Sequence, residues 1–221
     1  MLDVSDSRDE PQQRSNRKVE GQHKALTSLT VSKRLFDVFV SCLFLLPAFV
    51  FSALILFLIN PFLNRGPLLL KQPRMGKNCE PFSAYKFRSM LPAEVIERKA
   101  NDPLEHDRIT KLGCVLRKFH IDELPQIINV LRGEMSLIGP RPDYFPHAQA
   151  YLETVNGYRE RHAVLPGISG LAQTEIGYAQ GIEATRRKVL ADLYYIKNSG
   201  FRLEAWVLWR TLCVVLGRKG L

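Results

Sequence analysis

The hydrophobic pattern divides the chain into a polar leader, one long apolar segment and a mixed C-terminal part. Residues 1–32 hold few large apolar side chains and are rich in Asp, Glu, Arg, Gln and Ser, which is typical of a flexible leader. Residues 38–59, VFVSCLFLLPAFVFSALILFLI, carry no charge and could cross a bilayer core of about 30 Å as a helix. We therefore expect a leader over 1–32, a membrane anchor over 33–64 and one folded domain over 65–221.

The anchor has two features that bear on how it sits in the membrane. Pro47 lies near its middle, where the missing N–H removes a backbone hydrogen bond and bends a helix. Basic residues flank both ends, with Lys33 and Arg34 before it and Arg65 and Lys71 after it, so the positive-inside rule does not favour a simple crossing. We expect a re-entrant hairpin that enters and leaves on the cytoplasmic side, with a straight span as the alternative.

Charge indicates the kind of partner. The chain has 31 basic and 22 acidic residues, a formal charge of +9, which suits nucleic acid, phospholipid headgroups or a phosphorylated substrate. No continuous basic and aromatic surface or nucleic-acid module signature occurs, so we expect no nucleic-acid partner. The cysteines are widely spaced, without the paired spacing of a zinc site.

The domain after the anchor reads as α/β, mainly helical with a small sheet. Residues 68–70 predict a short strand and Gly76 and Asn78 a turn; Lys86 and Arg88 then alternate with apolar residues, which on a strand puts both cations on one face. A solvated strand face explains the same alternation. The segments 111–119 and 181–198 predict helices. The last segment, from residue 201, either lies in the headgroup region as a surface amphipathic helix or packs against the domain.

The segment FHIDELPQIINVLRGEMSLIGPRP, from residue 119, predicts a capped, half-buried helix. Asp122 suits the N-cap, Glu123 the positive end of the helix dipole, Pro125 the first turn and Gly133 the end. Apolar residues recur at helical spacing on one face, at Leu124, Ile127, Ile128 and Leu131. Nothing in this pattern by itself requires chemistry.

Cations nonetheless bracket Asp122 and Glu123 from separate parts of the sequence: Lys86, Arg88, Arg108, Arg117 and Arg141. Phosphoryl chemistry uses such a set, because one carboxylate can attack phosphorus, the other can hold a divalent cation, and arginine forks bind phosphate oxygens. Two adjacent ionised carboxylates repel, and a metal ion would relieve that repulsion.

An ordered set of motifs follows this pattern along most of the chain: KRLFD, YKFRSM, DRIT, LRKFHIDELPQIINVLRGEMSLIGPRP, RHAVLPGISGLAQ and DLYYIKN. From about residue 33 to the C-terminus the chain thereby resembles the small monotopic phosphoglycosyl transferases. These bacterial sugar transferases load a polyprenyl phosphate carrier at the start of exopolysaccharide, O-antigen or glycoprotein glycan synthesis. The resemblance implies a proline-broken, re-entrant anchor and a catalytic domain on the cytoplasmic face of the bacterial inner membrane.

The resemblance also implies roles for individual residues. Asp122 would attack the phosphorus nearest the sugar of a UDP-sugar and release UMP, and undecaprenyl phosphate would then take the phosphosugar. Glu123 would coordinate magnesium. The candidates for binding the phosphates are Lys86, Arg88, Arg117 and Arg141, each of which could instead bind membrane lipids or make an internal salt bridge.

The chain departs from the family pattern after Gln173, a further substrate-binding candidate. We expect PGISGLAQ to form a loop with Gln173 at its end. Many relatives continue with a small polar residue and a Gly-Arg pair, whereas this chain reads QTEIGYAQG. The sugar, the glycan pathway and the formation of a homodimer therefore stay open.

Two other functional classes fit part of the pattern. A membrane-tethered scaffold would need only the anchor and the basic surface, and would be indifferent to loss of Asp122. A nucleotide-sugar hydrolase would use the same carboxylates with water instead of a lipid acceptor. The anchor favours a lipid acceptor, because it places the site at the bilayer surface.

Overall fold

The computed structural model describes residues 31–64, 66–91, 106–176 and 181–217. Contacts within the chain divide it into Met1–Asp37 and Val38–Leu221. Residues 31–37 of the first unit are helical, and the expected leader lies almost wholly outside the described residues.

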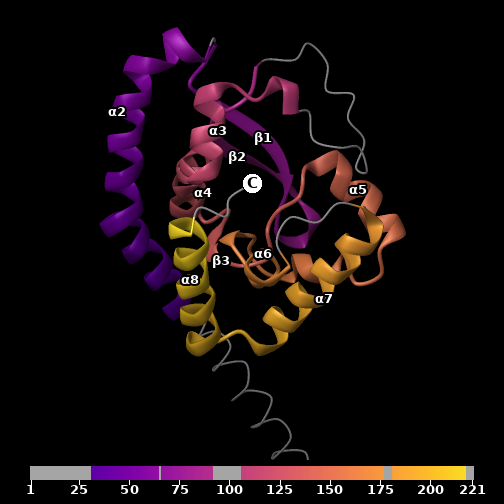
Figure 1. Cartoon of the computed structure of the whole chain (residues 1–221). Helices are drawn as coiled ribbons and strands as arrows, with labels where there is room; N and C mark the ends of the chain where they lie inside the picture. The colour runs from indigo at the N-terminus through magenta and orange to yellow at the C-terminus, as the bar shows by residue number, and fades with distance from the viewer. Residues whose placement is uncertain (1–30, 65, 92–105, 177–180, 218–221) are drawn as a thin grey trace, which may run out of the picture. The chain divides into compact units, whose positions relative to one another are not determined.

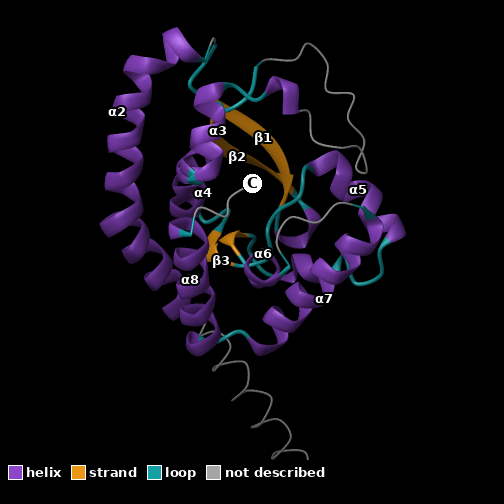
Figure 2. Cartoon of the chain, in the orientation of Figure 1, coloured by secondary structure: helices purple, strands orange, loops and turns teal. Residues whose placement is uncertain are grey.

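The second unit is mainly helical with little strand, as the sequence predicts (Figure 2). Its longer helices and its strands are α2 (Leu46–Leu63), β1 (Leu69–Met75), β2 (Pro81–Phe87), α3 (Lys111–Lys118), α4 (Ile127–Arg132), β3 (Ser136–Ile138), α5 (Phe145–Thr154), β4 (Gly167–Ser169), α6 (Leu171–Glu175), α7 (Ile182–Asn198) and α8 (Phe201–Leu216). Short helical turns are η1 (Ser41–Leu45), η2 (Lys77–Cys79), η3 (His106–Arg108), η4 (Ile121–Gln126) and η5 (Glu160–Ala163).

The strands form two separate pairs. β1 and β2 are antiparallel, with Leu69 opposite Phe87 and Met75 opposite Pro81, and the turn between them places Asn78 at φ 57°. This confirms the predicted strand and turn. β3 pairs in parallel with β4, so the loop expected for PGISGLAQ is wrong: the segment forms β4 and then α6. A Cβ on Gly167 would lie 2.1 Å from the backbone nitrogen of Gly139, so only glycine permits this close approach.

The core holds the β1–β2 hairpin between helices (Figure 1). α3 and α4 lie on one side of the hairpin and α5 on the other. Buried residues of α4, β3, α6, α7 and α8 form one apolar cluster, and those of β1, α5 and α7 form a second. A third joins Leu56 of α2 to Phe87 and Leu116. The hairpin is therefore packed against helices on both sides.

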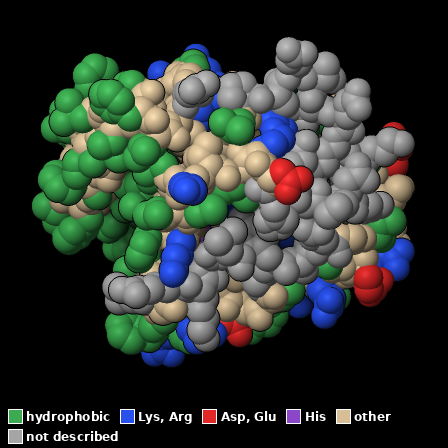
Figure 3. Space-filling view, turned by 45° about the horizontal axis from the view of Figure 1, so that its top comes forward, with side chains coloured by type: hydrophobic (Ala, Val, Ile, Leu, Met, Phe, Trp, Pro, Cys, Tyr) green, Lys and Arg blue, Asp and Glu red, His purple; other side chains and the backbone are tan. Residues whose placement is uncertain are grey.

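The apolar segment is helical from Val31 to Leu63 and is the one helix in the described part of the chain that is long and apolar enough to cross a membrane. One side of it contacts the domain, as where Phe49 stacks on Phe87, but it exposes large side chains such as Phe51, Leu54, Phe57 and Phe62. Figure 3 shows hydrophobic side chains gathered on one side of the view. A soluble core helix would be buried instead, so the exposure is consistent with an anchor.

The helix continues through Pro47 because its hydrogen bonding changes just before that residue. Ser41–Leu45 is π-helical, and the Leu46 N–H donates to the carbonyl of Ser41. Such a widened turn is a usual way for a helix to accommodate a local disruption. The re-entrant hairpin expected from the flanking charges stays a prediction.

Candidate active site

Asp122 and Glu123, hereafter the dyad, lie inside the 3₁₀ turn η4 and not at the start of an α-helix. The residue before the turn is His120, in the left-handed conformation at φ 55°, and no side chain caps it, so the prediction of Asp122 as N-cap is wrong. α4 follows and ends at Gly133 in the left-handed conformation, as predicted. Leu131, expected to be buried, is 37% exposed, and Val130 beside it is fully buried instead.

Glu123 is clamped between two cations from different elements. Its Oε1 accepts a hydrogen bond from Lys86 Nζ at 2.9 Å, and its Oε2 accepts one from Arg141 Nη1 at 2.8 Å. A second Arg141 nitrogen, Nη2, also contacts Oε1. The pairing with Arg141 is therefore bidentate, the geometry in which a guanidinium binds a carboxylate most strongly.

Asp122 is equally buried but is bound differently. Within the described ranges its carboxylate accepts no hydrogen bond, although Lys86, Arg117 and Arg141 all act on it through charge. Burial raises the pKa of Asp122 above its ordinary value, and the neighbouring charge of Glu123 raises it further. Burial also opposes ionisation of Glu123, but the charges and hydrogen bonds of Arg141 and Lys86 outweigh it and hold the pKa of Glu123 well below its ordinary value.

Two adjacent carboxylates whose pKa values are shifted in opposite directions are typical of sites in which the two groups have different roles. Glu123 is held ionised and immobile by its cations. Asp122 has its oxygens unengaged by hydrogen bonds, which leaves it able to attack an electrophile.

Lys86 reaches the dyad from β2, and the strand is fixed by a buried asparagine of α4. Asn129 Oδ1 accepts from the backbone N–H of Tyr85 at 3.0 Å, and its Nδ2 donates to the carbonyl of Ser83 at 2.7 Å. The Asn129 side chain thus bonds the strand on both sides of Ala84, two residues before Lys86. Burial lowers the pKa of Lys86, against the opposing charge of Glu123.

Arg117 is carried by α3, which begins at a side-chain cap: Thr110 Oγ1 accepts from Gly113 N at 2.9 Å. A Cβ on Gly113 would lie 1.9 Å from the carbonyl oxygen of Ser89, so the helix sits against the chain that leaves β2. Arg117 Nη2 lies 3.7 Å from Met90 Sδ, and its buried Nη1 has no hydrogen-bond partner in the described part of the chain. Such a guanidinium nitrogen can still bind an anion.

Two predicted site residues are engaged elsewhere. Arg88 follows β2 and donates from Nε to the carbonyl of Pro67 at 2.9 Å. Gln173 lies in α6, where its Nε2 is 3.4 Å from the carbonyl of Ile168 and its buried Oε1 has no partner among the described residues. The structure therefore brings Lys86, Arg117 and Arg141 to the dyad. Residues 177–180 of the atypical stretch after Gln173 lie outside the described ranges.

Magnesium suits the dyad by the chemistry of its donors. Magnesium is usually held by one or two carboxylates together with substrate phosphates and water, and Asp122 and Glu123 supply two adjacent carboxylates. A metal on Glu123 would compete with Lys86 and Arg141 for its oxygens. In the described ranges no group of three or more His, Cys, Asp or Glu side chains is arranged for a metal, so the remaining ligands would come from substrate and solvent.

The sequence did not point to a second charged cluster behind Arg141. We call it the Arg161 network; its members are Asp143, Tyr158, Arg161, Lys188 and Asp192. One signal was present, because Asp192 falls on the otherwise apolar face of the predicted helix over 181–198, between Val189 and Ile196. A charge at such a position is a candidate for a buried ion pair.

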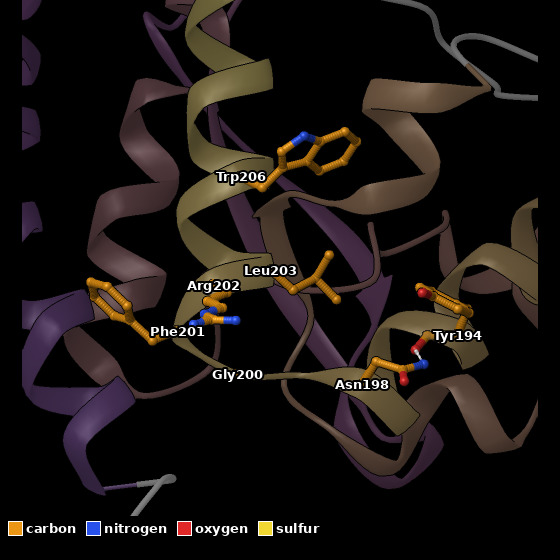
Figure 4. A pocket seen from close by; sticks show the side chains of 7 residues that line it. All are labelled: Tyr194, Asn198, Gly200, Phe201, Arg202, Leu203 and Trp206. Atoms are coloured by element: carbon orange, nitrogen blue, oxygen red, sulfur yellow. Dashed lines mark hydrogen bonds between the residues drawn. The ribbon is translucent and has the colours of Figure 1, made fainter.

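A separate open pocket lies where α7 meets α8, with a volume of about 550 Å³ (Figure 4). Its lining residues are Tyr194, Asn198, Gly200, Phe201, Arg202, Leu203 and Trp206. None of the predicted site residues lines it. The chemistry of the chain is therefore assigned to the dyad and not to this pocket.

Comparison with known proteins bears on what the dyad does. The family model described as bacterial sugar transferase matches residues 28–218. The exopolysaccharide production protein PSS of Rhizobium leguminosarum bv. phaseoli is 39% identical over 201 residues, which cover 85% of this chain and 96% of that protein.

Two longer relatives have names that state a reaction. One is the UDP-N-acetylgalactosamine-undecaprenyl-phosphate N-acetylgalactosaminephosphotransferase of Aeromonas hydrophila, 40% identical over 77% of this chain. The other is the UDP-glucose:undecaprenyl-phosphate glucose-1-phosphate transferase of Klebsiella pneumoniae, 37% identical over 84% of this chain. This chain spans only 39% and 38% of their respective lengths.

Proposed function

This chain is a member of the bacterial sugar transferase family, and we propose that it transfers a sugar 1-phosphate from a UDP-sugar to undecaprenyl phosphate with release of UMP. The names of the Aeromonas and Klebsiella relatives support this donor and acceptor. The name of the Rhizobium relative supports a place in exopolysaccharide synthesis. Because the relatives are named for different sugars, the proposal leaves the sugar open.

One observation carries the mechanism: the two carboxylates of the dyad are buried side by side, yet among the described residues cations bind only Glu123 through hydrogen bonds. We assign Asp122 as the nucleophile. An oxygen of Asp122 bonds to the phosphorus next to the sugar, the bond from that phosphorus to the bridging oxygen breaks, and the electron pair leaves with UMP. The sugar 1-phosphoryl group then passes from Asp122 to an oxygen of undecaprenyl phosphate, which regenerates the Asp122 carboxylate.

The cations neutralise the charge that moves during these steps. Arg141 and Lys86 are held by Glu123 and act on Asp122 through their charge, and Arg117 offers a guanidinium nitrogen that has no hydrogen-bond partner among the described residues. Prepositioned cations stabilise developing negative charge at little cost in reorganisation. Magnesium, when held by the dyad, would neutralise the diphosphate of the donor.

The anchor would keep this site at the membrane, where the acceptor is. We place the chain on the cytoplasmic face of the bacterial inner membrane, with the helix around Pro47 as a re-entrant hairpin and α8 as a surface helix. Val207 of α8 is fully buried while Phe201 and Trp209 are exposed, an arrangement that suits a helix between the domain and lipid headgroups. Lys33→Cys and Lys71→Cys, made singly in a cysteine-free chain, test the hairpin with a membrane-impermeant thiol reagent: a hairpin leaves both on one side, and a span separates them.

The transfer itself is tested with membranes that contain the protein, magnesium, undecaprenyl phosphate and a panel of UDP-sugars. The proposal predicts UMP release that depends on the acceptor with one of the sugars. Release of UDP would indicate glycosyl transfer without phosphate, and steady release of UMP without acceptor would indicate a hydrolase. No nucleotide product from any donor would favour a scaffold.

A further inference from the structure

The guanidinium of Arg161 is buried behind the loop that carries Arg141. It donates from Nη1 to Asp143 Oδ2 at 2.6 Å and from Nε to Asp192 Oδ2 at 2.8 Å. Its Nη2 donates to the backbone carbonyl of Arg141 at 2.8 Å. The side chain has 0% exposure, so these bonds are made away from solvent.

The loop of residues 140–143 is held at every backbone carbonyl. Going from residue 140 to 143, the hydrogen-bond donors are Gly167 N at 3.0 Å, Arg161 Nη2 at 2.8 Å, Arg74 Nη1 at 2.9 Å and Met75 N at 3.1 Å. The prolines on either side of Arg141 fix their own φ angles as well. The base of the Arg141 side chain is thereby fixed, and Arg161 holds the carbonyl of that residue itself.

The Arg161 network is not a second anion site, because its charges cancel. Arg161 and Lys188 face Asp143 and Asp192, and Lys188 Nζ lies 2.5 Å from Asp143 Oδ1. Tyr158 adds a neutral donor, its hydroxyl lying 2.8 Å from Asp143 Oδ2. No positive charge is left over for a ligand.

Stability alone does not explain such a network. Taking ion pairs out of water costs about as much as their attraction returns, and apolar residues often serve as well or better. What apolar residues could not supply is a charged donor aimed at the Arg141 carbonyl. The advantage of the Arg161 network therefore lies in the geometry that it gives the loop.

We propose that Arg161 is a positioning residue for the transfer reaction and acts through Arg141, an inference that rests on the function proposed above. Arg161 fixes the backbone from which the Arg141 guanidinium reaches Glu123, and with it the cation that faces the donor diphosphate. Lysine at position 161 keeps the charge, but its single nitrogen cannot reproduce the geometry of the bonds that Nε, Nη1 and Nη2 of Arg161 make to Asp192, Asp143 and the Arg141 carbonyl. A displacement of about 1 Å at a catalytic group is enough to cost about 100-fold in rate.

The test is a double-mutant cycle with Arg161→Lys, Arg141→Lys and the double variant, measured on acceptor-dependent UMP release. We expect each single variant to lower kcat/KM by about 30- to 100-fold, mainly through kcat. Because Arg161 acts through Arg141, the double variant should fall within about 3-fold of Arg141→Lys alone. Val207→Ala, a truncation in another part of the core, is the control, and its effect should add to that of Arg141→Lys.

A second readout does not depend on activity. Hydrogen exchange of the Gly167 and Met75 amides, which donate to the carbonyls of Pro140 and Asp143, should speed up in Arg161→Lys and not in Val207→Ala. Additive kinetic losses, or exchange that rises evenly along the chain, would overturn the positioning role. If the wild-type protein releases no UMP, the proposed function fails, and the exchange experiment still decides whether Arg161 holds the loop.

Asp192→Asn replaces Arg161→Lys if the latter does not fold, because asparagine keeps an oxygen for Arg161 Nε. The same non-additivity with Arg141→Lys is then expected at a smaller size. Additivity in that variant also counts against the inference.

Discussion

The dyad and the Arg161 network both set two carboxylates among cations, but only the Arg161 network closes on itself. In the Arg161 network each carboxylate accepts hydrogen bonds from cationic side chains: the fully buried Arg161 binds both, and the half-buried Lys188 also binds Asp143. At the dyad, Glu123 takes up Lys86 and Arg141, while Asp122 accepts no hydrogen bond among the described residues. The difference indicates that a closed network fixes structure and that a carboxylate left unbonded beside cations is available for chemistry.

The largest effect on the transfer rate is expected from mutations in the dyad. We expect Asp122→Asn to lower the transfer rate by about 10⁴-fold or more, because the amide cannot act as the nucleophile. Glu123→Gln should lose less, about 10²- to 10³-fold, since it removes the group that holds the cations and leaves the nucleophile. Steady-state UMP release on folded protein measures both, and equal losses in the two variants would contradict the assignment of roles.

Mutation of the Arg161 network should have its largest effect on the free energy of unfolding. Arg161→Leu leaves the buried Asp192 and the partly exposed Asp143 without their shared partner, and we expect it to cost about 3–5 kcal/mol in the free energy of unfolding. The exposed pair of Arg186 and Glu183, 3.1 Å apart, is the matched surface case, and Arg186→Leu should stay within about 0.5 kcal/mol. Chemical denaturation in detergent compares them, and similar costs would show that the network is not structural.

A buried histidine beside the network makes stability depend on pH. Burial, and then the charge of Arg161, lower the pKa of His162 to about 4, while the unfolded chain has the ordinary value of about 6.5. The unfolded state therefore binds the proton first on acidification, and about 3 kcal/mol of stability is lost as the pH falls from 6.5 to 4. His162→Gln should flatten this part of the profile, and an unchanged slope would exclude His162 as its source.

A smaller effect is expected in the pH dependence of the reaction. Burial and the charge of Glu123 raise the pKa of Asp122, and the nucleophile must be ionised, so kcat/KM should fall as the pH drops through that raised value. Glu123→Gln removes the repelling charge and should move this acid limb to lower pH. A shift to higher pH would mean that another group controls the limb.

The sequence predicted those features of the site that depend on local pattern. The β1–β2 hairpin, the helix ending at Gly133 and the gathering of Lys86, Arg117 and Arg141 around one carboxylate pair follow from turn residues, periodicity and charge. The prediction of an N-cap at Asp122 failed because His120 adopts a left-handed conformation, which the neighbouring residues do not indicate.

The Arg161 network could not be predicted because its members come from different elements far apart in the chain. Asp143 meets Lys188 only once α7 has packed against α5 and β1. Local periodicity carries no information about such pairings. It showed at most that Asp192 is a charge on an apolar face, without naming its partner.

The central claim is that Asp122 carries the phosphosugar before the acceptor arrives. The direct measurement is the exchange of labelled UMP into a UDP-sugar by the wild-type protein with magnesium and no undecaprenyl phosphate, using the sugar that supports transfer. The account predicts exchange in the wild-type protein, slower exchange in Glu123→Gln and none in Asp122→Asn. Exchange that persists in Asp122→Asn, or its absence from a wild-type protein active with acceptor, would contradict the account.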